Sequence, residues 1–260
     1  MIRSLLNIYQ YRELLLNLTL REIKVKYKQS VLGVLWAVIQ PLSMMAVFTF
    51  IFSFLIKMPS DGIPYPIFSY TALLPWTFFA AALSFAIPSV VANASLVTKI
   101  YLPREIFPFS AILAAFFDFC IASVIFVFLM LFYRVPLSWN VLYLLPILVV
   151  QIFLTLGVGL FASALNVYYR DVKYILPLGL QLWMYASPVI YPISVVPEKI
   201  RVIYMLNPMS PIIDSYRKVL LLGTTPDFAC LGFAAVVSLV VFVLGYKYFK
   251  KVEMSFADVI

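Results

Sequence analysis

Long stretches without a charged side chain are the feature of this sequence that most limits what it can fold into. Five stretches contain no charged residue: 31–56, 69–98, 135–169, 174–197 and 228–246. A sixth stretch, 106–133, contains a single charge, Asp118. Because a helix needs about 20 apolar residues to cross a bilayer, each stretch has roughly the length of one span. The sequence therefore predicts an all-α integral membrane protein with six transmembrane helices.

The composition fits a chain that is surrounded by lipid. Hydrophobic residues make up 64% of the sequence and charged residues 12%, which is far from the usage of a soluble domain. A soluble protein with buried helices is the alternative, and it is disfavoured because buried core helices are rarely this long. Charges interrupt any apolar core at the N-terminus, so we expect an uncleaved first span rather than a signal peptide.

The net charge of +8 raises the alternative of a nucleic-acid partner, but the positions of the basic residues favour a membrane topology. Lys and Arg gather before residue 31, after residue 246, and in the connections near 99–105 and 168–174. With six spans, all four segments fall on one side of the membrane. The positive-inside rule places that side, with both termini, in the cytoplasm. We expect no nucleic-acid partner.

Three segments outside the spans have the pattern of amphipathic helices. Residues 1–30 carry cations on one face and apolar side chains on another, which is typical of a helix lying in the membrane interface. The external connection at about 194–223 holds two shorter helices. In the second, Ile213 lies on the apolar face and Arg217 on the polar face, and Ser210 is expected to cap the start. This pair either rests on lipid or covers the outer end of a pathway. The chain thus divides into an interfacial helix at 1–30, a transmembrane domain at 31–246 and a cytoplasmic tail at 247–260.

The sequence carries few groups that perform chemistry. It has no His, its two cysteines indicate neither a disulfide framework nor a metal site, and no Walker A sequence occurs. We therefore expect no catalytic residue, no metal and no cofactor in this chain. Asp118 is the one charge inside a span. It is a candidate for a transport pathway or coupling site, with a structural hydrogen bond to a neighbouring helix as the alternative.

Aromatic residues are abundant, with 23 Phe, 17 Tyr and 4 Trp. Some belong to the interfacial belts of a membrane protein. Aromatic faces also suit the apolar C–H faces of sugars, while Tyr and Trp donate hydrogen bonds. Those within the spans therefore either line a path for a glycan or pack between helices and against lipid. With Asp118, the possible pathway residues are Trp36, Phe78, Phe79, Trp183 and Tyr185.

Three segments, taken in order, resemble one family. Between spans two and three lies TKIYLPREIFPFS, into span five runs NVYYRDVKYILPLGLQLWMYASPVIYP, and in the external connection lies LNPMSPIIDSYRKVLL. Together they resemble the permease subunit of bacterial type-2 ABC exporters for surface polysaccharides, a group that covers O-antigen, teichoic acid and capsule. The resemblance runs over essentially the whole chain. It implies half of a dimeric channel in the bacterial inner membrane, exporting a lipid-linked polysaccharide.

The resemblance also implies partners and residue roles. A second copy of the chain and two copies of a separate ABC ATPase, which would bind ATP and Mg, complete such a transporter and account for the missing Walker A motif. The loop at about 94–106 corresponds to the coupling helix that docks on the ATPase. The residues assigned in this way are Lys99, Tyr101, Pro103, Arg104 and Glu105 for ATPase coupling, Arg170 and Asp171 for a cytoplasmic loop, and Asn207, Pro208, Ile213, Tyr216 and Arg217 for the external gate.

Other functions stay open at this point. An ABC exporter for a drug or lipid would need neither two external helices nor an aromatic pathway. An ion-coupled carrier would work without an ATPase and would depend on Asp118. A membrane glycosyltransferase would need acidic residues grouped at a membrane face for a metal and a sugar nucleotide, and Asp171 and Glu105 are too isolated in the sequence for that role.

Overall fold

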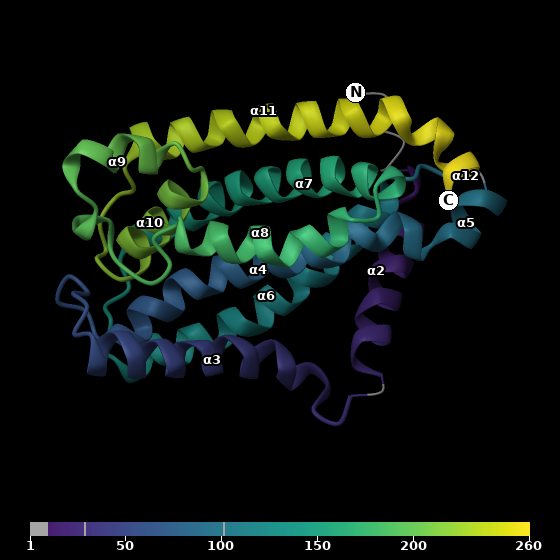
Figure 1. Cartoon of the computed structure of the whole chain (residues 1–260). Coiled ribbons are helices and arrows are strands. Elements are labelled where there is room, and N and C mark those ends of the chain that lie inside the picture. The colour runs from purple at the N-terminus through teal and green to yellow at the C-terminus, as the bar shows by residue number, and fades with distance from the viewer. Residues whose placement is uncertain (1–9, 29, 101) are drawn as a thin grey trace.

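The chain forms helices that run mostly side by side (Figure 1). The computed structural model describes residues 10–28, 30–100 and 102–260, and this part contains no strand. Within it, five segments are long and apolar enough to cross a membrane: Gly33–Leu55, Tyr65–Ala92, Ile106–Phe132, Trp139–Tyr168 and Phe228–Val259. The prediction of an all-α integral membrane protein is confirmed.

The helices match the predicted spans closely. The first span consists of the 3-10 turn η1 (Gly33–Leu35), α3 (Trp36–Phe48) and the π-helical segment η2 (Thr49–Leu55). The next three are α4 (Tyr65–Ala92), α6 (Ile106–Phe132), and α7 (Leu144–Tyr168) with the 3-10 segment η3 (Trp139–Tyr143) before it. The last, α11 (Phe228–Val252), continues beyond the predicted end of the span into the basic tail.

The fifth predicted span, at about 175–192, is where the structure differs. Its helix α8 (Val172–Tyr185) has 14 residues, or about 21 Å at 1.5 Å per residue, which is shorter than a hydrocarbon core of about 30 Å. An irregular segment, 186–192, follows it, because Pro188 and Pro192 cannot continue a helix. Then come the 3-10 turn η4 (Ile193–Val195), α9 (Glu198–Met205) and α10 (Met209–Leu220). α8 and the segment after it lie where the sequence predicts the fifth span, and a total of six spans stays a prediction.

α10 does not rest on the surface. Ten of its 12 residues are buried, and it contacts α4, α7 and α11. Its start also differs from the prediction. Ser210 lies inside the helix, and the oxygen that accepts from the first turn is Oδ1 of Asn207, 3.1 Å from the backbone nitrogen of Met209. The expected cap at Ser210 is therefore wrong.

The centre of the bundle is α4. The apolar stretch of α4 is 61% buried, against 6% for the first span. α4 contacts α3, α6, α7, α8 and α10, whereas the first span, α3 with η2, leaves large apolar side chains such as Val47, Phe50 and Phe54 exposed. Because α4 meets α10 at one end and leads into the short helix α5 (Ala94–Lys99) at the other, it connects the two ends of the molecule (Figure 1).

α7 and α11 approach each other at two glycines. A Cβ atom added to Gly157 would lie 2.5 Å from the backbone nitrogen of Phe242, and one added to Gly245 would overlap the carbonyl oxygen of Gly157. Small residues allow membrane helices to pack backbone against backbone. The contact at Gly157 is thus close, and it allows α7 and α11 to run together along their length (Figure 1).

The remaining helices lie at one end of the bundle. α2 (Arg12–Tyr27) crosses the long helices at a steep angle (Figure 1), packs on α6 and buries Leu18 and Thr19. Residues 1–9 of the predicted interfacial helix lie outside the described residues. The chain ends in the 3-10 turn η5 (Glu253–Ser255) and α12 (Phe256–Val259), which contacts α5 and α7.

Candidate functional site

The candidate docking element is α5, at the end of the bundle where α12 also lies (Figure 1). One residue, Asn93, separates it from α4. Lys99 is exposed, and Pro103 and Arg104 are half-buried. These three residues line a cavity of about 360 Å³ between α5, the loop after it and the C-terminal segment. Tyr101, the other predicted contact on this loop, lies outside the described residues.

Glu105, which the resemblance assigned to ATPase coupling, is fully buried. Its carboxylate accepts a hydrogen bond from Nζ of Lys250 at 2.7 Å and from the hydroxyl of Tyr246 at 3.3 Å. Lys250 also bonds Glu253 at 2.9 Å. A buried carboxylate needs such partners, since an unpaired charge there is costly. Glu105 therefore ties the start of α6 to the end of α11 and presents no surface to a partner.

The C-terminal segment forms the other wall of the same cavity. Phe256 is fully buried, and Glu253, Met254 and Ala257 line the space opposite the loop after α5. One guanidinium nitrogen of Arg104, Nη1, is buried and has no hydrogen-bond partner among the described residues. The end of the chain thus shares one surface with the predicted docking helix, a relationship that no sequence motif indicated.

Arg170 and Asp171 are exposed in the turn between α7 and α8. The carbonyl oxygen of Asp171 accepts from the backbone nitrogens of Tyr174 at 2.9 Å and Ile175 at 3.0 Å, which starts α8. This turn lies at the same end of the bundle as α5 (Figure 1). The two loops predicted to be cytoplasmic therefore lie at the same end of the bundle.

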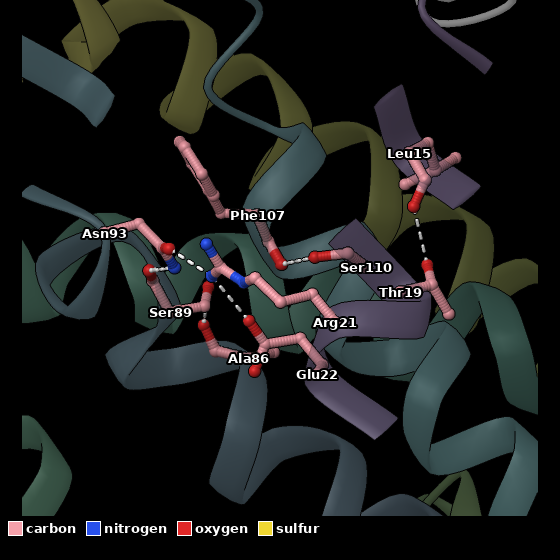
Figure 2. Close-up of polar contacts among 9 residues, drawn as sticks. All are labelled: Leu15, Thr19, Arg21, Glu22, Ala86, Ser89, Asn93, Phe107 and Ser110. Atoms are coloured by element: carbon pink, nitrogen blue, oxygen red, sulfur yellow. Dashed lines mark hydrogen bonds and ion pairs between the residues drawn. The ribbon is translucent and has the colours of Figure 1, made fainter. Parts of the chain in front are cut away.

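The joint between α4 and α5 is held by a side-chain contact that the sequence reasoning missed (Figure 2). Asn93 is buried, and its Nδ2 donates to the carbonyl oxygen of Ser89 at 2.8 Å. Its Oδ1 accepts a hydrogen bond from the guanidinium of Arg21 on α2, which also pairs with Glu22 at 2.9 Å. The one sign of this contact in the sequence is the amide side chain of Asn93, which stands between the second span and the docking loop.

At the other end of the molecule, Arg217 on α10 is buried. Its Nη1 donates to the carbonyl oxygens of Pro188 at 2.5 Å and Tyr191 at 3.2 Å, and its Nη2 donates to that of Val189 at 2.8 Å. The guanidinium carbon lies 3.7 Å from the ring centroid of Phe68 on α4. One cation thus joins α10, α4 and the irregular segment after α8.

Asn207 and Trp183, which the sequence assigned to a gate and a pathway, form one cluster. Nε1 of Trp183 donates to Oδ1 of Asn207 at 2.8 Å, and Nδ2 of Asn207 donates to Oγ of Ser187 at 2.8 Å and to the carbonyl of Ala186 at 3.0 Å. Phe79 packs edge-on against Trp183 with ring centroids 5.0 Å apart. Asn207 therefore closes the end of α8 against the start of α10.

Two further gate residues face the interior of the protomer. Ile213 is fully buried, and the hydroxyl of Tyr216 donates to Oε1 of Gln151 on α7 at 3.0 Å. Nε2 of Gln151 in turn donates to the carbonyl oxygen of Pro75 on α4 at 2.7 Å. Pro208 stands at the residue before α10. Gln151 was missed, although an amide in an otherwise apolar span is the kind of residue that faces a protein interior.

Three of the possible pathway residues line one cavity. Trp36, Phe78 and Asp118 border a space of about 390 Å³ between α3, α4 and α6. The carboxylate of Asp118 pairs with the ammonium of Lys26 and accepts from the hydroxyl of Tyr27, both on α2. Of the other candidates, Phe79 and Trp183 belong to the cluster of Asn207, and Tyr185 is exposed on α8.

Two charged groups outside the spans are tuned by their neighbours. Backbone hydrogen bonds from Cys230 and Ala229 hold the pKa of Asp227, which caps α11, below its usual value. Partial burial alone would lower the pKa of Lys218 on α10, but its hydrogen bond to Asp214, at 2.8 Å, and the charge of Asp214 raise it.

The sequence was compared with known families and proteins. The ABC-2 type transporter family matches residues 13–221. The O-antigen export system permease protein RfbA of Klebsiella pneumoniae is 32% identical over 251 residues, which is 95% of this chain and 95% of RfbA. RfbA of Myxococcus xanthus is 30% identical over 99% of each chain. The polysialic acid transport protein KpsM of Escherichia coli is 22% identical over 91% of this chain and 92% of KpsM.

These similarities agree with the geometry: apolar helices long enough to span a membrane, a short helix at one end directly continuous with the most buried span, and a buried helix closing the other end. The family match extends over most of the chain, and relatives with 30% or more identity align over nearly its full length. This multi-pass membrane protein belongs to the ABC-2 type transporter family.

Proposed function

We propose that this chain is the channel-forming transmembrane subunit of an ATP-driven ABC transporter that exports a lipid-linked, O-antigen-like polysaccharide across the bacterial inner membrane. The observation that carries the proposal is the full-length similarity to O-antigen export permeases from two organisms, at 30–32% identity. The similarity to a polysialic acid transport protein adds a second polysaccharide transporter. The chain supplies the path, and ATP hydrolysis comes from a separate subunit.

In this proposal two copies of an ABC ATPase, which bind ATP and Mg, dock on the face formed by α5, the loop after it and the turn between α7 and α8. Lys99, Arg104 and Arg170 offer charged side chains on that face. The loops there are short and basic, and the positive-inside rule places such loops in the cytoplasm. Both termini then lie in the cytoplasm as well.

The continuity of α4 supports a mechanism for coupling. When the ATPase subunits close, they push α5, and that displacement enters α4 through Asn93 and through Val97, which is buried in the same apolar cluster as Val90 of α4. The far end of α4 is bound to α10 through Phe68 and Arg217, and its middle through Pro75 and Gln151. A packed interface with two arrangements can convert such a local push into opening, so α10 and the segment 186–192 act as the outer gate.

A second copy of the chain completes the channel in this proposal. The exposed faces of α3 with η2 and of α8 are strongly apolar, and their aromatic members include Trp36, Phe50, Tyr174 and Tyr185. Lipid or a second protomer can cover such faces. Aromatic side chains on facing protomers would offer stacking surfaces to sugar rings without tight binding.

The alternatives that the sequence left open differ in what they require. An ion-coupled carrier would use Asp118 as its coupling carboxylate, and here that carboxylate is already paired with Lys26. An ABC exporter for a drug or lipid shares the ATPase partner and differs only in its cargo. An experiment therefore has to identify the molecule that is transported.

The test is purification of the tagged chain from host membranes in mild detergent, followed by reconstitution into vesicles of host lipids. We expect a co-purifying ATPase subunit, vanadate-sensitive ATP hydrolysis, and accumulation of lipid-linked glycan inside inverted vesicles. Arg104→Glu should lower hydrolysis by the complex, whereas Lys199→Glu, the same kind of charge reversal on α9 at the opposite end, should not. A homo-oligomer without a hydrolysing partner, or vesicles that move a drug or lipid but no glycan, would contradict the proposal.

A further inference from the structure

Asn93, the residue that joins α4 to α5, makes unusual side-chain hydrogen bonds (Figure 2). An Asn at the residue before a helix normally accepts a hydrogen bond from a backbone N–H of the first turn. Asn93 stands at that position for α5, yet its side chain makes no such bond. Its Nδ2 donates back to Ser89 on α4, and its Oδ1 accepts from Arg21 on α2. The side chain of the joint is thus engaged by α2 and α4 and leaves the first turn of α5 uncapped.

α2 is fixed independently of that contact. Leu18 and Thr19 are buried against the bundle, and α2 packs along α6. Near its C-terminus, Lys26 and Tyr27 both bind the carboxylate of Asp118 on α6. A helix that is bound at several points along its length is fixed relative to the rest of the bundle. Arg21 lies between those points, so its guanidinium reaches Asn93 from a fixed base.

We propose that Arg21 is a positioning residue for the docking helix: through its hydrogen bond to Asn93, α2 sets the angle at which α5 leaves α4. This inference rests on the proposed function, in which α5 receives the motion of the ATPase. Without the bond, α5 keeps its peptide joint to α4 and the packing of Val97 in the apolar cluster that includes Val90 and Phe256, but nothing ties Asn93 to α2. A push on α5 then bends the joint further before it moves the span. The interfacial helix is then part of the transmission and not only an anchor.

A measurement on the permease alone tests the geometry. In a background of Cys120→Ala and Cys230→Ala, a spin label attached to Ser95→Cys reports the motion of α5 from an exposed position. We expect Arg21→Ala to add a mobile component to the spectrum and Arg21→Lys to restore much of the immobile one. Lys24→Ala removes the same charge from an exposed position on the same helix and should leave the spectrum unchanged. A spectrum of Arg21→Ala equal to that of the parent overturns the proposal.

A second measurement tests the functional consequence in the complete transporter. The stimulation of ATP hydrolysis is the maximal rate of the complex divided by that of the ATPase subunit alone. Arg21→Ala should lower this stimulation by about fivefold, at the lower end of coupling between distant sites, and should leave the KM for ATP unchanged. Because the two side chains share one bond and Asn93 also bonds Ser89, Arg21→Ala combined with Asn93→Ala should lose no more than Asn93→Ala alone. Multiplied losses in the double variant overturn the proposal.

The two measurements separate the two proposals. If the parent complex hydrolyses no ATP, the proposed function fails, while the spin label still decides whether Arg21 holds α5. If the parent hydrolyses ATP normally and Arg21→Ala changes neither readout, the proposed function stands and the positioning role of Arg21 is refuted.

Discussion

The hydroxyl of Tyr216 on α10 donates to Oε1 of Gln151 on α7, and Nε2 of the same amide donates to the carbonyl oxygen of Pro75 on α4. Three helices from distant parts of the sequence therefore share one buried amide. Because Gln151 is fully buried, each of these hydrogen bonds depends on the others being made. The arrangement links the candidate outer gate to the central span.

Replacing that amide should destabilise the protein. Gln151→Leu leaves the buried hydroxyl of Tyr216 without its acceptor and removes the side-chain donor to the carbonyl oxygen of Pro75, at an expected cost of about 1 to 3 kcal/mol in the free energy of unfolding. Adding Tyr216→Phe to Gln151→Leu removes one of the stranded groups, so the double variant should be no less stable than Gln151→Leu. SDS unfolding in mixed micelles measures both. Additive losses would show that the two side chains do not interact.

Arg217 should be more important to α10 than its charged neighbour. Arg217→Met removes the donors for the carbonyl oxygens in segment 188–191, at an expected cost of about 2 to 3 kcal/mol, and should speed labelling of a cysteine introduced at position 189. Lys218→Met deletes the same charge one residue later, where the side chain pairs with Asp214 at partial exposure. Its effect should stay within about 1 kcal/mol. Equal labelling in the two variants would contradict a closing role for Arg217.

The glycine contact between α7 and α11 predicts a strict size limit. Gly157→Ala places a Cβ atom against the backbone of Phe242, and overpacking of this kind costs about 1 to 3 kcal/mol. Gly232→Ala on α11 is the matched control, because its Cβ would meet nothing within 4 Å among the described residues. It should gain about 0.5 to 1 kcal/mol from helix propensity. Thermal unfolding in detergent compares the two.

The cap of α11 predicts a pH-dependent stability of the protein. Backbone donors in the first turn lower the pKa of Asp227 in the folded protein below its ordinary value of 3.8. A depressed pKa contributes stability that is complete above the unfolded value and is lost as pH falls through the folded one. Thermal stability should therefore decline below about pH 4. Asp227→Asn keeps the cap without titrating, so it should show a weaker decline. Identical pH profiles would exclude Asp227 as the source.

Much of the fold could be read from the sequence because a bilayer imposes length and polarity on each segment separately. The uncharged stretches predict α4, α6 and α7 within a few residues, since each must satisfy its own backbone hydrogen bonds in lipid. The same rule was insufficient for the stretch 174–197. Its composition suits a span, but Pro188 ends α8 early, and the buried α10 packs beside the segment that follows.

The candidate site was predicted in part for a similar reason. Motifs placed Asn207, Tyr216 and Arg217 together outside the membrane, yet no spacing indicated that Arg217 would reach the carbonyl oxygens after α8. Glu105 stood in a loop motif and read as a surface contact, but it is buried beside Lys250 from the far end of the chain. Residues so distant in sequence carry no mutual pattern.

What the sequence by itself determined was the class of the protein: helices long enough to cross a membrane, basic loops on one side, and the order of segments shared with polysaccharide exporters. Tertiary structure alone decided which polar groups meet. Arg21 and Asn93, Lys26 and Asp118, and Gln151 and Tyr216 pair across helices that are far apart in the chain. Local polarity dictates whether a segment enters the bilayer, whereas such pairs depend on the rotation and depth at which separate helices pack.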